Sequence, residues 1–268
     1  MEKKFKLGVI GAGFMSTAII KGAIKSGAVN AEEIIVSDVN KQSLIKIAEN
    51  GVNTTLDTKE LANNSEFVLF AVKPQSLSDV LPIISDCACE KFISIMAGVR
   101  KDRIKSSVPK SKVARCMPNT PCSIGFGAVG LDVSDFSCDA DIKFINGLLS
   151  SFAQVVEVDE EKMHAVTGVS GSSPAYFYMF VKGVIDAGVQ NGLDYETAKT
   201  LAVATMVGAG EMVKQNPDKS LEELISAVCS KGGTTIEAVK VFEQSGLNNI
   251  TKKAVDACVK RSKELENL

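Results

Sequence analysis

A short glycine turn near the amino terminus joins an apolar run to a helix-like segment. The run ends at Ile10 and is followed by Gly11-Ala12-Gly13-Phe14-Met15, after which the pattern is helical. Gly11 permits a tight turn, and Gly13 lets backbone amides approach a pyrophosphate, which the positive end of a helix dipole attracts. Ser16 stands where the motif has its third glycine and is small enough for close helix packing. The turn predicts a dinucleotide site, with an ordinary strand-to-helix connection as the alternative.

The residues after the second apolar run bear on which dinucleotide binds. Asp38 lies where an acidic side chain can accept hydrogen bonds from the ribose hydroxyls of NAD. Its neighbours Ser37, Asn40 and Lys41 could instead contact the 2′-phosphate of NADP, and an aspartate before a helix is also a common cap. Both NADH and NADPH therefore stay open.

Two further turns, in the second half of the chain, combine small residues with hydroxyl groups. Ser172 and Ser173 precede Pro174, which predicts a loop that ends with Ser173 capping a helix. The second turn is Gly232-Gly233-Thr234-Thr235, whose glycines expose successive amides and whose threonines add hydroxyls. Such turns suit a small carboxylate, although both segments could be helix caps only.

The elements that position these turns follow from the pattern of the first half of the chain, where apolar runs alternate with helix-length segments. Strands separated by helices indicate βαβ units and a parallel sheet covered on both faces. A glycine-punctuated stretch, 126–133, is a candidate additional strand. The expected strands are 5–10, 34–37, 67–71, 92–95, 112–116 and 155–158.

After residue 159 the pattern changes to helices alone. We therefore expect a dinucleotide-binding domain over 1–160 and an all-helical domain over 161–268. The stretch 175–181 is apolar on nearly every face, so a helix there must be buried all round. With a mean hydropathy of +0.13, this predicts burial against a second subunit. The expected helices are 174–192, 195–215, 220–229, 234–246 and 248–266.

Composition argues against several classes of function. Thirty Lys and Arg against 32 Asp and Glu give a formal net charge of −2, which leaves no basic surplus for nucleic acid or an anionic membrane. Seven scattered cysteines and a single histidine, His164, argue against a disulfide framework, a metal site or a histidine-based triad. We expect His164 to have a surface or hinge role. The charged amino terminus and the lack of a membrane-length apolar run predict a cytoplasmic protein.

Six further segments lie in order along the chain: Ile10-Gly-Ala-Gly-Phe-Met15, Ala71-Val-Lys-Pro-Gln75, Ser94-Ile-Met-Ala-Gly-Val99, Arg115-Cys-Met-Pro-Asn-Thr-Pro121, Val169-Ser-Gly-Ser-Ser-Pro-Ala-Tyr176 and Val228-Cys-Ser-Lys-Gly-Gly-Thr-Thr235. Taken together, these segments resemble the pyrroline-5-carboxylate reductase family, and the similarity spans nearly the whole chain. Members of this family reduce a cyclic imine acid to proline with NADPH or NADH. The resemblance implies an α/β fold, with an N-terminal Rossmann-type dinucleotide-binding domain and an all-α dimerisation domain that forms homodimers and, in larger assemblies, decamers of five dimers.

The resemblance also implies roles for individual residues. It places the Thr235 hydroxyl near the ring nitrogen, where it assists protonation, and Asn119 where it orients the nicotinamide amide. Lys73 could equally be a solvated lysine at a strand end. The residues implied at the nicotinamide half are Ala71, Val72, Lys73, Pro74, Ala97, Gly98 and Asn119. The residues implied at the substrate are Ser172, Ser173, Gly232, Gly233, Thr234 and Thr235.

One departure from the family pattern bears on the cofactor. Relatives often carry arginine at the position of Val39, where it suits the 2′-phosphate of NADP. With valine there, NADH could serve as well as NADPH or better.

The implied chemistry demands little of the side chains. A protonated imine is already electrophilic, so the protein must mainly hold it against the nicotinamide, exclude water and orient the nitrogen. One alternative is a carbonyl reductase of similar architecture, such as a β-hydroxyacid dehydrogenase or ketopantoate reductase, which would need a dedicated proton donor. The other is a dimer that senses nucleotide without catalysis.

Overall fold

The computed structural model describes residues 3–266, which form two compact units. One unit contains the chain up to Ser172 together with the end of α12 (Leu247–Glu266) from Cys258 onward, and the other contains Ser173–Ala257. We expected the division after residue 160. Residues 161–172 group instead with the sheet because they pack against it: a Cβ added at Gly130 would lie 2.6 Å from Val166 Cγ1.

The first unit is built on a single sheet in the order β3-β2-β1-β4-β5-β6-β7-β8. Neighbouring strands are parallel except for β6 and β7, which are antiparallel. The order reverses between β1 and β4, which is where open α/β sheets bind ligands. The strands are β1 Phe5–Ile10, β2 Ile34–Ser37, β3 Asn53–Thr55, β4 Ser65–Phe70, β5 Lys91–Ser94, β6 Lys112–Pro118, β7 Gly127–Asp132 and β8 Ala153–Glu157.

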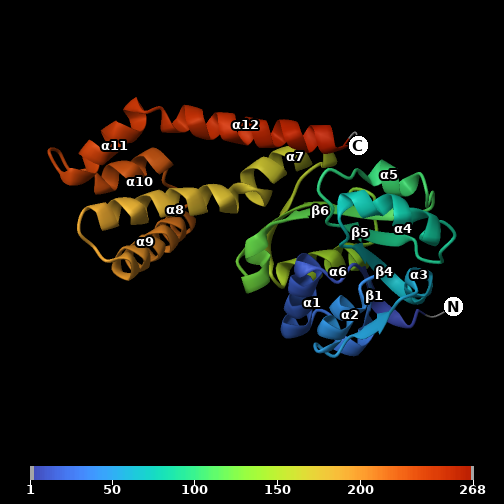
Figure 1. Cartoon of the computed structure of the whole chain (residues 1–268). Helices are drawn as coiled ribbons and strands as arrows, with labels where there is room; N and C mark the ends of the chain where they lie inside the picture. Colours follow the sequence, from blue (N-terminus) through green and yellow to red (C-terminus); the bar gives the residue numbers. More distant parts are fainter. Residues whose placement is uncertain (1–2, 267–268) are drawn as a thin grey trace. The chain divides into compact units, whose positions relative to one another are not determined.

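Helices cover both faces of this sheet, as expected for βαβ units (Figure 1). Side chains of β4 alternate between the two cores: Phe67 and Leu69 pack with α1, α2 and α6, whereas Val68 and Phe70 pack with α3, α4 and α5. The helices are α1 Phe14–Ser26, α2 Lys41–Ala48, α3 Thr58–Asn64, α4 Leu77–Ile84, α5 Lys101–Lys105 and α6 Asp139–Ser150.

The second unit is entirely helical, and the expected helices are confirmed to within three residues at each end. Its own core is small, formed by Ile185, Ala198 and Ala202 with Val181 packed against them. Many apolar side chains stay exposed, and Met179, in the apolar stretch of α8, is 74% exposed. The helices are α8 Ser173–Gln190, α9 Tyr195–Gln215, α10 Leu221–Val228, α11 Thr234–Gln244 and the first part of α12; α7 (Met163–Val166) precedes them in the first unit.

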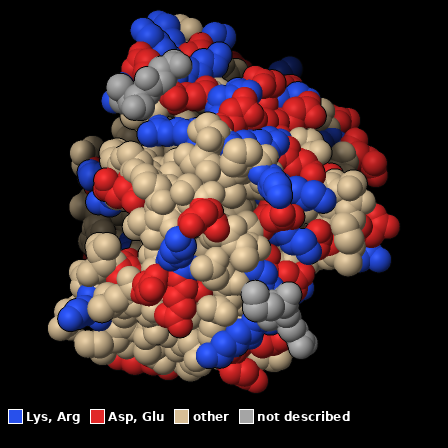
Figure 2. Space-filling model, turned by 90° about the vertical axis from the view of Figure 1, so that its right-hand side faces the viewer, with Lys and Arg blue, Asp and Glu red and all other residues tan. Residues whose placement is uncertain are grey.

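Charged side chains of both signs are interspersed on the surface. Figure 2 shows one face on which Lys and Arg alternate with Asp and Glu, as the near-neutral net charge leads one to expect. Within residues 3–266, no helix combines the length and apolar character that crossing a membrane requires.

Candidate functional site

The glycine turn after β1 has the geometry of a phosphate cradle. Gly11 has φ +107°, and a Cβ there would lie 2.8 Å from the carbonyl oxygen of Ala71, so only glycine fits. Gly13 is the N-cap of α1; no described side chain caps this helix, and a Cβ at Gly13 would meet no described atom within 4 Å. The space beside Gly13 at the start of α1 is therefore open, as a pyrophosphate contact would require.

Asp38 holds this turn in place. One of its carboxylate oxygens accepts a hydrogen bond from the Ala12 amide at 2.7 Å, and the other accepts one from the Asn40 amide, also at 2.7 Å. The carboxylate therefore joins the end of β2 to the turn after β1. Its remaining lone pairs stay available for the predicted ribose hydroxyls. Sequence reasoning did not predict this contact of Asp38 with the turn.

Ser37 does not present its side chain to a ligand. The residue is fully buried, and its hydroxyl accepts a hydrogen bond from Thr58 Oγ1 at 3.2 Å. Its carbonyl accepts the Gly11 amide at 2.7 Å. The prediction that Ser37 could contact a 2′-phosphate directly does not agree with this burial, so its contribution is to support the glycine turn.

The loop after β4 runs beside the glycine turn. The Ala71 amide donates to the Ile10 carbonyl at 2.9 Å, and Ala71 and Val72 are half-buried. Pro74 then begins a short 3-10 turn, Pro74–Ser76, which ends the extended segment as predicted. Lys73 is exposed, as a solvated lysine or a ligand contact would both require.

The loop after β5 differs from expectation at Gly98. We expected Ala97 and Gly98 to leave room for the nicotinamide ring. Gly98 has φ +71° and is buried, and a Cβ there would lie 3.3 Å from Leu265 Cβ. The space next to Gly98 is therefore occupied by the end of α12, whereas Ala97 is half-buried.

Asn119, at the end of β6, has an amide that is engaged within the protein. Its Oδ1 accepts the Ala128 amide at 3.0 Å, and its Nδ2 donates to the Ser170 carbonyl at 3.4 Å. The residue is only 9% exposed. The predicted hydrogen bond from Asn119 to the ring amide would compete with these two bonds. They join three segments around the end of β6.

The segment containing Ser172 and Ser173 is not the loop that we expected. A π-helical turn, Thr167–Gly171, continues directly from α7, and α8 begins at Ser173. Ser172 Oγ accepts a hydrogen bond from Cys258 Sγ at 3.2 Å, and Ser173 is buried. π-turns inside helices occur frequently at functional sites, and the capping pattern does not predict one here.

The second glycine turn begins α11 in the way that was expected. Gly232 has φ +72°, and Gly233 is the N-cap, with no described side chain capping the helix. A Cβ on Gly233 would lie 2.3 Å from Ser230 Oγ. Thr234 and Thr235 occupy the first turn and are exposed. Open amides beside two hydroxyls are a suitable receptor for a carboxylate.

The predicted residues thus fall into two groups. The first group lies in the first unit, at the carboxyl ends of parallel strands. It consists of the glycine turn, Asp38, the loops after β4 and β5, and Asn119. The turn Gly232–Thr235 belongs to the second unit. Nowhere in the described part of the chain do three or more His, Cys, Asp or Glu side chains gather in a way that could hold a metal ion.

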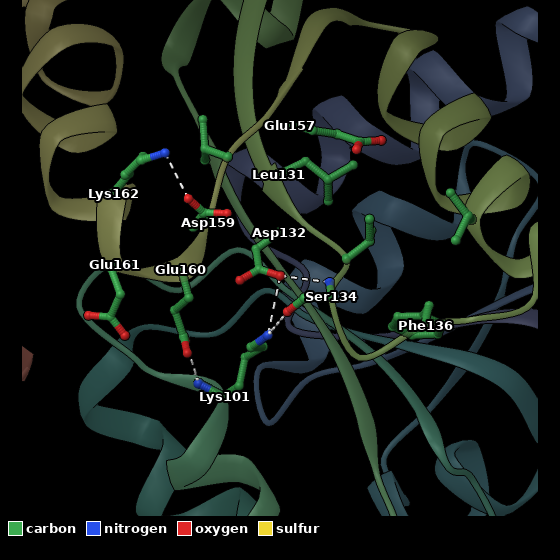
Figure 3. Close-up of a pocket in the computed structure, with 13 residues that line it drawn as sticks. Lys101, Leu131, Asp132, Ser134, Phe136, Glu157, Asp159, Glu160, Glu161 and Lys162 are labelled. Carbon is green, nitrogen blue, oxygen red and sulfur yellow. Dashed lines mark hydrogen bonds and ion pairs between the residues drawn. The ribbon is translucent and has the colours of Figure 1, made fainter.

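A charged pocket of about 640 Å³ lies where β7, β8 and α5 meet, and sequence reasoning missed it (Figure 3). Lys101 Nζ contacts Ser134 Oγ at 2.7 Å, Asp135 at 3.1 Å and Asp132 at 3.2 Å. Burial alone would lower the pKa of Lys101, but its carboxylate partners raise it above the ordinary value. Burial would raise the pKa of Asp132, but hydrogen bonds from Ser134 and the charge of Lys101 lower it overall. Because the sequence shows no pattern for such a pairing, only the fold reveals it.

Family models match both halves of the chain. A model described as pyrroline-5-carboxylate reductase dimerisation matches residues 160–265, and one described as NADP oxidoreductase, coenzyme F420-dependent, matches residues 6–98. The second match covers the glycine turn and the loops after β4 and β5, and the first covers the helical unit.

Fold and site together define the class: an oxidoreductase with an N-terminal Rossmann-type dinucleotide-binding domain and an all-α dimerisation domain. The pyrroline-5-carboxylate reductase of Haemophilus influenzae is 39% identical over 97% of each chain. The chain therefore belongs to the pyrroline-5-carboxylate reductase family, which confirms the resemblance seen in the sequence.

Solved structures agree with this membership. A pyrroline-5-carboxylate reductase from Coxiella burnetii superposes with a TM-score of 0.90 at 32% identity, covering 98% of this chain and 99% of its own. The pyrroline carboxylate reductase of Plasmodium falciparum, solved with NADP bound, has a TM-score of 0.86 at 30% identity and covers 99% of this chain and 100% of its own.

Proposed function

We propose that this protein reduces 1-pyrroline-5-carboxylate to L-proline, the last step of proline biosynthesis, with NADH or NADPH. Family membership over the full chain carries this proposal. The two glycine turns support it geometrically, because each begins a helix that no described side chain caps. The cofactor supplies a hydride, and the substrate nitrogen gains a proton.

We assign the cofactor to the first unit. The amides that begin α1 hold the pyrophosphate, Asp38 accepts the adenosine ribose hydroxyls, and the loops after β4 and β5 flank the nicotinamide half. The residues assigned to the cofactor are Gly11, Ala12, Gly13, Phe14, Met15, Asp38, Ala71, Val72, Lys73, Pro74 and Ala97. Ser37, Gly98 and Asn119 support these segments through contacts within the protein.

We assign the substrate carboxylate to Gly232, Gly233 and Thr234 in the second unit. The exposed amides at the start of α11 accept a negative charge, and the helix dipole favours it there. Thr235 is the catalytic residue, because its hydroxyl can hydrogen-bond the ring nitrogen and assist its protonation. Ser172 and Ser173 complete the assigned substrate residues.

One observation favours an imine over a carbonyl substrate. A carbonyl reductase needs a proton donor such as histidine or lysine beside the reacting oxygen. Both ring nitrogens of His164, the single histidine, are already bound, to Ser262 Oγ and to Glu266 Oε2. Lys73 is the remaining candidate, and the imine reaction does not require it.

We also propose a homodimer as the basic assembly, with a decamer of five dimers as the larger form to be tested. The exposed apolar side chains of α8 and α9 support a protein partner for the helical unit. All seven cysteines are unpaired, which supports the expected cytoplasmic location.

The proposal is tested by following the loss of reduced-nicotinamide absorbance when 1-pyrroline-5-carboxylate is added to the purified protein, with NADH and NADPH in separate assays. We expect oxidation of at least one cofactor and formation of proline. Folded protein that binds a reduced cofactor but oxidises neither would overturn the proposal and favour a nucleotide sensor.

A further inference from the structure

The loop between β5 and α5, residues 95–100, lies on the side of the sheet where the nicotinamide half of the cofactor is assigned. The adenosine half faces β2 through Asp38, and the pyrophosphate lies at the turn after β1. Because β4 and β5 follow β1 on the opposite side from β2, the rest of the dinucleotide extends over their ends. This placement rests on the proposed function. The contacts that hold this loop in position therefore affect how the nicotinamide ring is bound.

The last turn of α12 packs directly on this loop. Gly98 faces Leu265, and a Cβ on Gly98 would lie 3.3 Å from Leu265 Cβ and 3.5 Å from the Glu266 amide nitrogen. Gly98 has no side chain to keep the helix away. The end of the carboxyl-terminal helix, which is distant in the sequence, therefore packs against this loop.

The end of α12 lies beside α7 (Figure 1), and His164 of α7 contacts it. Its Nε2 lies 2.6 Å from Glu266 Oε2, and its Nδ1 lies 2.9 Å from Ser262 Oγ. A carboxylate only accepts hydrogen bonds, so Nε2 carries the hydrogen, and in neutral His164 the Ser262 hydroxyl donates to Nδ1. His164 is 7% exposed and Ser262 5%. The surface role expected for the histidine is therefore wrong: it is a buried docking point for α12.

Glu266 joins this docking point to the loop itself. Its second oxygen, Oε1, lies 3.4 Å from Arg100 Nη1, and Arg100 is the last residue before α5. Arg100 also contacts Glu161 at 2.7 Å and Glu160 at 3.5 Å. The next amide along the chain, that of Lys101, donates to Glu160 Oε1 at 2.8 Å. The Glu266 side chain thus contacts both His164 and the loop.

We propose that Glu266 is a positioning residue for the cofactor: by contacting His164 and Arg100, it holds the end of α12 against Gly98 and fixes the loop that borders the nicotinamide ring. It touches neither the adenosine nor the pyrophosphate region, which Asp38 and the glycine turn define. Substituting Glu266 should therefore weaken binding of the nicotinamide end of the dinucleotide only.

The test compares two ligands on two variants. Glu266→Ala removes the contacts; Glu264→Ala is the matched control, because Glu264 lies in the same turn and pairs only with Arg261 among the described residues. Binding of NADH and of ADP-ribose, which lacks the nicotinamide ring, is measured by calorimetry. We expect Glu266→Ala to raise the dissociation constant of NADH about fivefold or more and to leave that of ADP-ribose within about twofold, with both unchanged in Glu264→Ala. Equal weakening of both ligands, or no weakening of either, would overturn the proposal.

A second variant and a second measurement keep the proposal testable if Glu266→Ala does not fold. Leu265→Gly keeps every charge but removes the Cβ that lies against Gly98, and it should weaken NADH binding in the same selective way. Amide hydrogen exchange without cofactor should be faster in residues 96–101 of Glu266→Ala than in wild type or Glu264→Ala; unchanged exchange there would contradict the proposal. Because these readouts do not involve substrate, they stand apart from a failure of the reductase activity.

Discussion

Thr235 is the residue on which the assigned chemistry depends most. It lies exposed in the first turn of α11, beside amides that no described side chain caps. We predict that Thr235→Ala lowers kcat about 10- to 100-fold, because the hydrogen bond to the reacting nitrogen is lost. The dissociation constant for the cofactor should stay unchanged, because the glycine turn after β1 is untouched. Steady-state kinetics and calorimetry check this; an unchanged kcat would remove Thr235 from the mechanism.

We expect Val39 to influence the choice between the two cofactors. It is 99% exposed beside Asp38, so this edge offers a carboxylate and an apolar side chain where a 2′-phosphate would need a cation. We predict that wild type uses NADH at least as well as NADPH. Val39→Arg should raise the ratio of kcat/KM for NADPH over NADH about tenfold or more, while Val39→Gln, which adds length without charge, should not. An unchanged ratio in Val39→Arg would show that the phosphate is bound elsewhere.

At the scale of single residues, sequence reasoning indicated the local backbone geometry better than the side-chain contacts. The tight turn at Gly11 was predicted for the right physical reason, because glycine can adopt the positive φ found there. The partners of Ser37, Gly98 and Asn119 were not predicted, since none of these partners is adjacent in the sequence. Those partners, Thr58, Leu265 and Ala128, become neighbours only when the chain has folded.

Among the elements, the cluster around α5 is the clearest case in which burial and charge together set stability. Asp132 and Asp135 both have pKa values below the ordinary value for aspartate, although burial opposes this, because Ser134, Lys101 and Lys105 stabilise their charged forms. A carboxylate whose folded-state pKa is depressed stabilises the fold above its unfolded pKa, about 3.9, and that stabilisation is lost as the pH falls through the folded value.

We therefore predict that the free energy of unfolding falls as the pH is lowered below about 4. Asp132→Asn should cost about 1–3 kcal/mol at neutral pH and flatten this acid dependence. Urea unfolding followed by circular dichroism at several pH values checks both. Asp159→Asn is the control, because Asp159 lines the same pocket with its side chain 75% exposed. An equal effect of the two substitutions would contradict the role given to the buried cluster.

The elements themselves were largely readable from periodicity. Strands β1 and β2 begin and end at the predicted residues, because both are apolar runs bounded by polar or glycine residues. Strand β3 was missed because Asn53–Thr55 is short, polar and at the sheet edge, where no apolar pattern is required. The π-turn before α8 was missed because its backbone bonding leaves no signature in the hydrophobic pattern.

For the molecule as a whole, the exposed apolar surface of the helical unit predicts assembly. Leu201 is 56% exposed and lines an apolar hollow of about 810 Å³ together with Phe177 and Phe180. We predict that Leu201→Asp shifts the protein toward monomers at micromolar concentration, because a charge there is costly to bury against a partner. Lys199→Asp, two residues along the same helix, should leave the assembly intact. Sedimentation velocity distinguishes the species, and unchanged assembly in Leu201→Asp would place the interface elsewhere.

In the proposed reaction a hydride passes from the nicotinamide to the imine carbon of the substrate. The most direct measurement uses NADH deuterated at both C4 positions, with 1-pyrroline-5-carboxylate and the wild-type protein, followed by mass spectrometry of the product. We predict proline with one deuterium, located on the ring carbon that was the imine carbon. Proline without deuterium, or no proline from protein that binds NADH, would contradict it.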